Sequence, residues 1–103
     1  MATSVYLAST GTQTHRVFRV GATVAAQNFA TGAVFYTVPG DKRLVMKGDF
    51  SVAPDWDGTN HRAKLDGKAG DVEYTFVFPP GSRLMLASSP TEFVATGFLE
   101  DDV

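Results

Sequence analysis

The chain has 103 residues, a net charge of −2 from 9 basic and 11 acidic residues, and no cysteine. This length predicts one domain, residues 1–103, with a modest core. The charge argues against a nucleic-acid-binding domain, which normally carries a clustered basic excess. Without cysteine there is no disulfide framework and no thiolate metal site.

The beginning of the chain, "MATSVYLASTG", has neither the basic start nor the long apolar run of a signal peptide. No apolar segment approaches the roughly 20 residues that a membrane-spanning helix needs. We therefore expect no contact with a membrane.

The apolar residues follow the two-residue period of β-strands almost throughout. Strands are predicted, in chain order, in "SVYLA" (4–8), "HRVFRVGATV" (15–24), "AVFYTV" (33–38), "RLVMKGDFSV" (43–52), "RAKL" (62–65), "VEYTFVF" (72–78), "RLMLA" (83–87) and "EFVATGFL" (92–99). The segment "GATVAAQNFATG" (21–32) is predicted to be an irregular connection. Short strands separated by Gly, Pro and Asp turns predict an all-β fold, an antiparallel sandwich or jelly-roll-like domain of about eight strands without a major helix.

The alternation within these runs also predicts the core. One face of each strand should contribute the side chains Leu44, Met46, Tyr74, Phe76, Leu84 and Leu86. Phe76 could face either way, since a bulge would shift its register.

One short pattern occurs twice. "YTVPGDKRLVM" (36–46) and "FVFPPGSRLML" (76–86) align Arg43 with Arg83 at an offset of 83 − 43 = 40 residues. In each copy an aromatic strand ends at proline, turns through glycine and leaves as Arg-Leu, because proline ends a ladder and glycine permits the bend. Either two hairpins or two sheet-crossing corners would give the halves an approximate two-fold likeness. The alternative is chance recurrence, since turns draw on few residue types.

These corners resemble those of small β-sandwich and jelly-roll proteins of bacteriophage virions, such as head decoration (cement) proteins and tail-associated modules. The second copy, from Pro79 to Leu84, fits the order proline-x-glycine-x-arginine, whereas the first has Gly40 one place early and Asp41 at the glycine position. The resemblance implies a jelly-roll-like sandwich. By analogy it implies a place in the virion, with assembly in the host cytoplasm.

No set of residues suited to catalysis emerges. His15 and His61 lack the spacing of metal ligands on one element. The stretch "DWDGTN" (55–60) has the alternate carboxylates of a calcium loop, but Gly58 is in its fourth position instead of the sixth. We therefore expect a polar loop with Asp-Gly turns over 53–71, no metal or cofactor, and no enzymatic activity.

Three functions are compatible with these features to different degrees. A structural virion protein agrees with the low charge and the corner motif, and we expect a homo-oligomer, a trimer, seated on a larger assembly such as a capsid or tail. The alternative is a carbohydrate-binding or adhesin-like module, because Trp56 between two aspartates could stack on a sugar. A cupin-like hydrolase would need a metal set that two separate histidines cannot supply. The candidate interface residues, each of which could instead be core, are Phe29, Trp56, Phe93 and Phe98.

Overall fold

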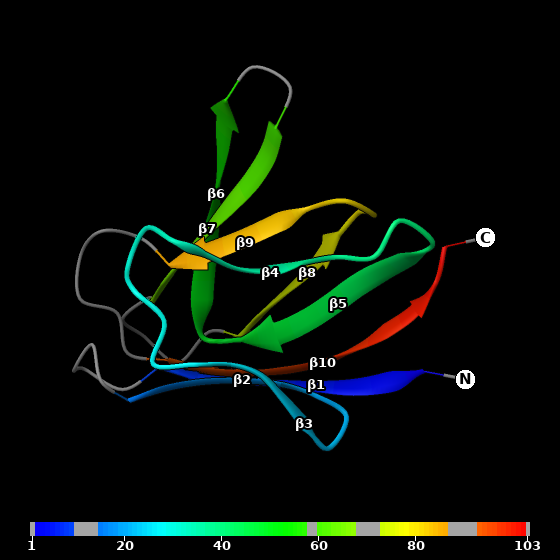
Figure 1. Ribbon diagram of the computed structural model, residues 1–103, viewed down its shortest axis with the longest axis horizontal. Coiled ribbons are helices and arrows are strands. Elements are labelled where there is room, and N and C mark those ends of the chain that lie inside the picture. The colour runs from blue at the N-terminus through cyan, green and yellow to red at the C-terminus, as the bar shows by residue number, and fades with distance from the viewer. Residues whose placement is uncertain (1, 10–14, 58–59, 68–72, 87–92, 103) are drawn as a thin grey trace.

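The computed structural model describes residues 2–9, 15–57, 60–67, 73–86 and 93–102, with only the backbone described for 53–57 and 60–62. Within these ranges the chain forms ten strands and no helix (Figure 1). The strands are β1 (Thr3–Ser9), β2 (Arg16–Val20), β3 (Thr23–Gln27), β4 (Val34–Thr37), β5 (Lys42–Gly48), β6 (Phe50–Asp57), β7 (Asn60–Gly67), β8 (Tyr74–Phe78), β9 (Arg83–Leu86) and β10 (Phe93–Asp101).

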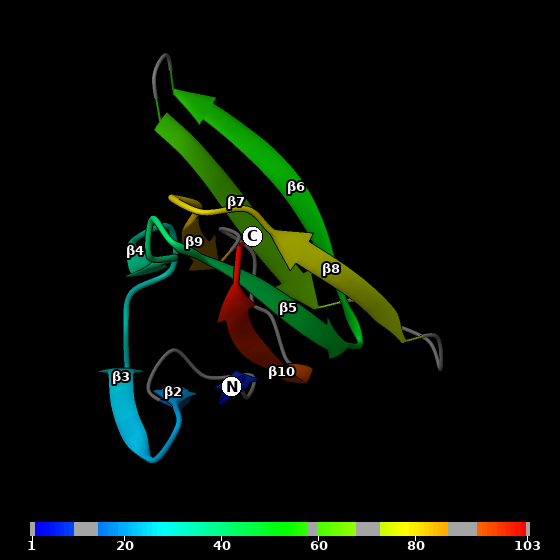
Figure 2. The same cartoon turned by 90° about the vertical axis from the view of Figure 1, so that its right-hand side faces the viewer.

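The strands form two sheets that enclose the core as a sandwich-like fold (Figure 2). The six-stranded sheet has the order β3-β2-β1-β10-β5-β8, and all its pairs are antiparallel. The four-stranded sheet has the order β4-β9-β7-β6, in which β7 and β9 run parallel. The predicted all-β class is confirmed, but the described strands number ten instead of about eight, and the smaller sheet is mixed.

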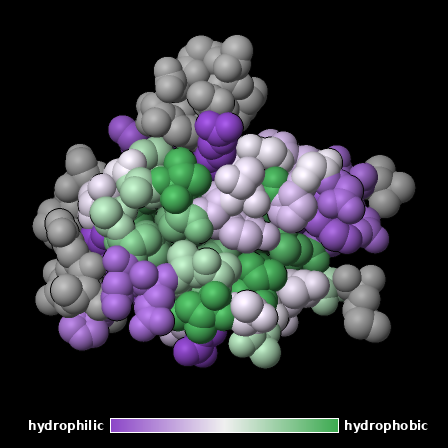
Figure 3. All heavy atoms as spheres, in the orientation of Figure 1, coloured by the Kyte–Doolittle hydropathy of each residue, from purple (hydrophilic) through white to green (hydrophobic). Residues whose placement is uncertain are grey.

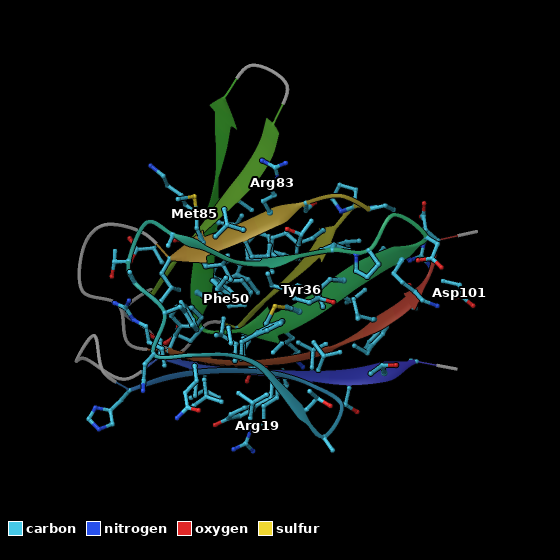
Figure 4. The ribbon with its side chains drawn as sticks, in the orientation of Figure 1. Arg19, Tyr36, Phe50, Arg83, Met85 and Asp101 are labelled. Carbon is cyan, nitrogen blue, oxygen red and sulfur yellow. The ribbon has the colours of Figure 1, made fainter. Side chains whose placement is uncertain are left out.

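The core lies between the sheets, where alternate residues of each strand meet. Leu44, Met46, Leu84 and Leu86 are fully buried, as predicted. Phe76 is partly buried and packs against the core, with its ring 5.2 Å from that of Phe50, and Tyr74 is half-buried next to it. Figure 4 shows Phe50 directed into the space between the sheets. The inward face of β8 was therefore predicted correctly.

The predicted strand 15–24 is in fact two strands, β2 and β3, joined by a tight turn at Gly21. Gly21 has a φ of 63°, and its N–H donates to the carbonyl of Ser4 at 2.7 Å. All of β3 lies in the segment 21–32 that was predicted to be irregular. The low strand propensity of its alanines is overridden by pairing with β2, which supplies a ladder of hydrogen bonds.

Two further predictions are wrong. The run 43–52 is divided at Asp49 into β5 of the larger sheet and β6 of the smaller sheet, so the chain changes layers where one strand was expected. The polar loop predicted over 53–71 is in large part the β6–β7 hairpin, in which Trp56 pairs with His61. The strand predicted at 62–65 within it is confirmed as part of β7. Polar residues suffice here because backbone pairing, which composition does not reveal, defines the strands.

The repeated motif forms two sheet-crossing corners, which decides between the alternatives drawn from the sequence. The first leads from β4 of the four-stranded sheet to β5 of the six-stranded sheet, and the second leads from β8 back to β9. In each corner the proline carbonyl accepts a hydrogen bond from the residue three places on: Pro39 from Lys42 at 3.2 Å, Pro79 from Ser82 at 3.1 Å.

The corners also bind each other. The Val38 N–H donates to the Ser82 carbonyl at 2.8 Å, and the Gly81 N–H donates to the Val38 carbonyl at 2.9 Å. β5 pairs with β8, and β4 pairs with β9. If the two copies of the motif are exchanged, β4 takes the place of β8 and β5 takes the place of β9, so the β5–β8 pair becomes the β9–β4 pair. The strand order therefore has the local two-fold likeness that the sequence repeat suggested.

The two turns differ at one backbone position, which gives a first prediction. Gly81 has a φ of 83°, whereas the equivalent Asp41 is not among the positive-φ residues. We expect Gly81→Ala to lower the free energy of unfolding by about 1 kcal/mol, because a side chain is strained in this conformation. Gly40→Ala is the control, since its added methyl group would meet nothing within 4 Å. Urea unfolding followed by circular dichroism measures both, and equal effects would contradict the prediction.

Candidate interaction surface

The face of the six-stranded sheet turned away from the four-stranded sheet, here called the outer face, carries several exposed hydrophobic side chains. Val77 is 59% exposed and Phe98 37%, and Tyr6, Val24 and Val94 are also exposed. These are five of the six large exposed hydrophobics found among the described residues. Arg19 is paired with Tyr6 and Val24, and Figure 4 shows it directed away from β4 and β9. Hydrophobic exposure is therefore concentrated on this face.

Strand register aligns three of the outer-face residues. Phe98 of β10 lies opposite Val45 of β5, and Val45 lies opposite Val77 of β8. Because directly opposed residues have Cβ atoms about 5 Å apart, their side chains form a contiguous strip across three strands. We call this strip of Phe98, Val45 and Val77 the apolar row. It ends at the edge of the sheet, since β8 is the last strand.

Ion pairs border the apolar row. Arg43 pairs with Glu100 across β5 and β10 on the same face as Val45 and Phe98, whereas the neighbouring pair Lys42–Asp101 lies at the end of the same two strands on the opposite face. The hydrogen bond from Lys42 lowers the pKa of the Asp101 carboxyl, and the same bond raises the pKa of Lys42. On the other side, Lys47 lies 3.3 Å from Glu73. These paired charges leave the border polar and nearly neutral, which is the composition of an interface rim.

A hollow of about 560 Å³ adjoins the outer face at the start of β10. Its lining includes Lys47, Asp49, Glu73, Val94 and Thr96. The Oδ1 atom of Asp49 is buried there without a hydrogen-bond partner. In the described part of the chain no group of three His, Cys, Asp or Glu side chains could hold a metal ion. The hollow offers polar groups beside the apolar Phe93 and Val94, without a recognisable catalytic set among the described residues.

The structure separates the four candidate interface residues. Phe98 lies on the outer face, whereas Phe93 is only 4% exposed and stacks on Phe50 in the core. Phe29 is partly buried, with its ring stacked on Phe35 at 4.3 Å. The side chain of Trp56 lies outside the described side chains. Among the three candidates whose side chains are described, Phe98 is therefore the one available to a partner on the outer face.

Sequence reasoning assigned no role to Arg16, which is 2% exposed. Its guanidinium donates to the Phe29 carbonyl at 2.7 Å and to the hydroxyl of Thr31, and it lies over the Phe29 ring. It thereby holds the connection between β3 and β4 against the sheet. The available signal was the alternation in β2, which places Arg16 on the same face as Phe18.

A second surface lies along one side of the sandwich, at the edge strands β3 and β4 of the two sheets. The stretch from Val20 to Gly40 contains no charged residue. Figure 3 shows neutral and hydrophobic side chains over the centre of this side, with charged groups toward its border. Val24 and Val34 are 45% and 42% exposed. The surface is less continuous than the outer face, because its exposed apolar residues belong to two different sheets.

Comparisons with protein-family models, curated proteins and solved structures find no match. Within the described residues there is also no helix long and apolar enough to cross a membrane.

Proposed function

We propose that the chain is a structural virion protein of the bacteriophage type, a capsid decoration or tail-associated subunit that joins copies of itself and seats on a larger assembly. The observation that carries this proposal is the outer face, with its in-register apolar row and its border of paired charges. Contiguous exposed hydrophobic surface of this kind usually marks an interaction site.

The energetics favour a protein partner. Full burial of a Val or Phe side chain is worth about 1.5–3 kcal/mol. The outer-face side chains are already partly covered by their neighbours, so covering what remains contributes about 1 kcal/mol each. Several such anchors within a rim of polar groups form the normal anatomy of a protein interface.

The virion role is supported by the corner motif. The stretch from Pro79 to Leu84 has the order of residues that resembles phage decoration and tail proteins, and both corners join the two sheets as a jelly-roll-like sandwich requires. The trimer expected from the sequence stays a prediction.

The alternative function, carbohydrate binding, has one observation in its favour. The hollow beside Lys47 brings two carboxylate side chains and the Thr96 hydroxyl next to Val94. A sugar site usually adds an exposed aromatic ring as a platform, whereas the aromatic in this lining, Phe93, is buried in the core. The outer face is the better-supported site.

The self-association part of the proposal predicts the effect of Phe98→Ser. In analytical ultracentrifugation the wild-type chain should sediment as a species larger than its 11.0 kDa monomer. Phe98→Ser should weaken the association about tenfold, as expected for losing roughly 1.4 kcal/mol of apolar contact. Val34→Ser is the matched control, because Val34 is exposed to a similar extent but lies on β4. A wild-type chain that remains monomeric at all concentrations would contradict the proposal.

A further inference from the structure

Two sheets have four edge strands, here β3, β8, β4 and β6. An unprotected edge is a template for pairing with another chain, and proteins normally blunt it with bulges, proline or charge. β3 and β4 each carry a bulge: the register against β2 shifts between Phe18 and Arg19, and the register against β9 shifts between Val34 and Tyr36. The sequence of β6 contains Pro54 and two aspartates. Three of the four edges are therefore protected.

β8 has none of these protections. Its residues, Tyr74-Thr75-Phe76-Val77-Phe78, include no charge and no proline, and they pair with β5 without a register shift. Aromatic and β-branched side chains of this kind strongly favour strands. Within the described residues β8 pairs only with β5, and its contact with β6 is made on the inner face by the Phe50 and Phe76 rings. Its outer edge is thus suited to accept a further strand.

We propose that this edge pairs with β8 of a second copy, antiparallel and about a two-fold axis perpendicular to the sheet. The inference rests on the self-association proposed above and names one of its contacts. An uncharged strand can pair with itself without placing like charges opposite each other, and the nearest acidic residue, Glu73, already faces Lys47. Such an axis joins the two six-stranded sheets into one.

The outer face gives the reason for choosing a second copy as the occupant. The apolar row ends at Val77 on β8, the most exposed large hydrophobic among the described residues. A two-fold axis beside β8 places the row of one copy in line with that of its partner on the same side of the joined sheet. The two apolar rows then form one row of twice the length, and each copy covers the exposed Val77 end of the other. This geometry gives a dimer, whereas a trimer would require a heterologous contact.

Hydrogen exchange tests the pairing directly. In the associated wild-type chain, the amides of Tyr74–Phe78 that do not bond to β5 should exchange at least about tenfold more slowly than in the dilute monomer. The amides at the outer edge of β3 should not change. At a concentration at which the Phe98→Ser chain is associated, it should keep the β8 protection, because Phe98 lies two strands away from the edge.

A pair of variants provides the second test. Val77→Lys places a cation on the proposed contact, as natural edge strands do, and should yield a monomer. Val34→Lys is its control, since Val34 is also an exposed valine of an edge strand, but one with a bulge and outside the outer face. Association with unprotected β8 amides, or as a trimer, would overturn this inference while leaving the proposed function standing. A strictly monomeric wild type would overturn both.

Discussion

Gly97→Ala is expected to lower the free energy of unfolding by about 3 kcal/mol or more, close to the upper end for single substitutions. Gly97 lies in β10, opposite Met46 of β5. A Cβ atom added there would come within 1.8 Å of the carbonyl oxygen of Val45. That oxygen belongs to the backbone of a central strand, so it cannot move without disturbing the ladder that joins β10 to β5.

Gly40→Ala again serves as the control for Gly97→Ala, since it adds the same methyl group in open space. Thermal unfolding followed by circular dichroism should show a fall of roughly 15 °C or more for Gly97→Ala, at 4–8 °C per kcal/mol for a domain of this size. Gly48→Ala should also be destabilising, because its Cβ would lie 2.6 Å from the carbonyl of Val94. A loss below about 1 kcal/mol for Gly97→Ala would show that the two strands can separate more easily than argued.

The sequence was most informative where one strand has one buried face. In β8 the alternation correctly predicts that Tyr74 and Phe76 face the core. In β9 it correctly predicts that Leu84 and Leu86 are buried, although Met85 between them is only 4% exposed as well. The recurring Pro-Gly corners were also recognisable, because proline and glycine limit the backbone strongly enough to act locally. These features depend on residues within a few positions of one another.

Features that depend on pairing between distant segments could not be predicted. The change of layer at Asp49 leaves the alternation of 43–52 intact, so nothing in the pattern marks it. The parallel pairing of β7 with β9 and the strand at Thr23–Gln27 likewise arise from partners elsewhere in the chain. The same holds for the apolar row, because Phe98, Val45 and Val77 come together only through the register of three strands.

The candidate interface residues illustrate the same limit. The alternation in β10 places Phe93 and Phe98 on opposite faces, since they are five residues apart. It does not say which face is covered by the other sheet. The structure resolves this, with Phe93 in the core and Phe98 on the outer face.

The last prediction tests whether the two corners are equivalent in energy as well as in sequence. Leu44 and Leu84 hold corresponding positions, directly after the arginine that follows each turn, and both are fully buried. Leu44→Ala and Leu84→Ala should each lower the free energy of unfolding by about 3–4 kcal/mol, through lost burial and the cavity left behind. Urea unfolding at equilibrium measures both values.

The two leucines should be about equally costly to remove. Leu44 lies in β5, which pairs with β8, and Leu84 lies in β9, which pairs with β4, the strand that corresponds to β8 in the other copy of the motif. Each substitution should therefore remove similar contacts, and the two losses in free energy of unfolding should agree within about 1 kcal/mol. Val45→Ala, at a half-buried position next to Leu44, should cost about 1 kcal/mol or less, because little volume is lost from the core. The double variant should be largely unfolded, since a domain of this size is stable by only about 5–15 kcal/mol. If the two losses in free energy of unfolding differ by a factor of two, the corners resemble each other only in their turns.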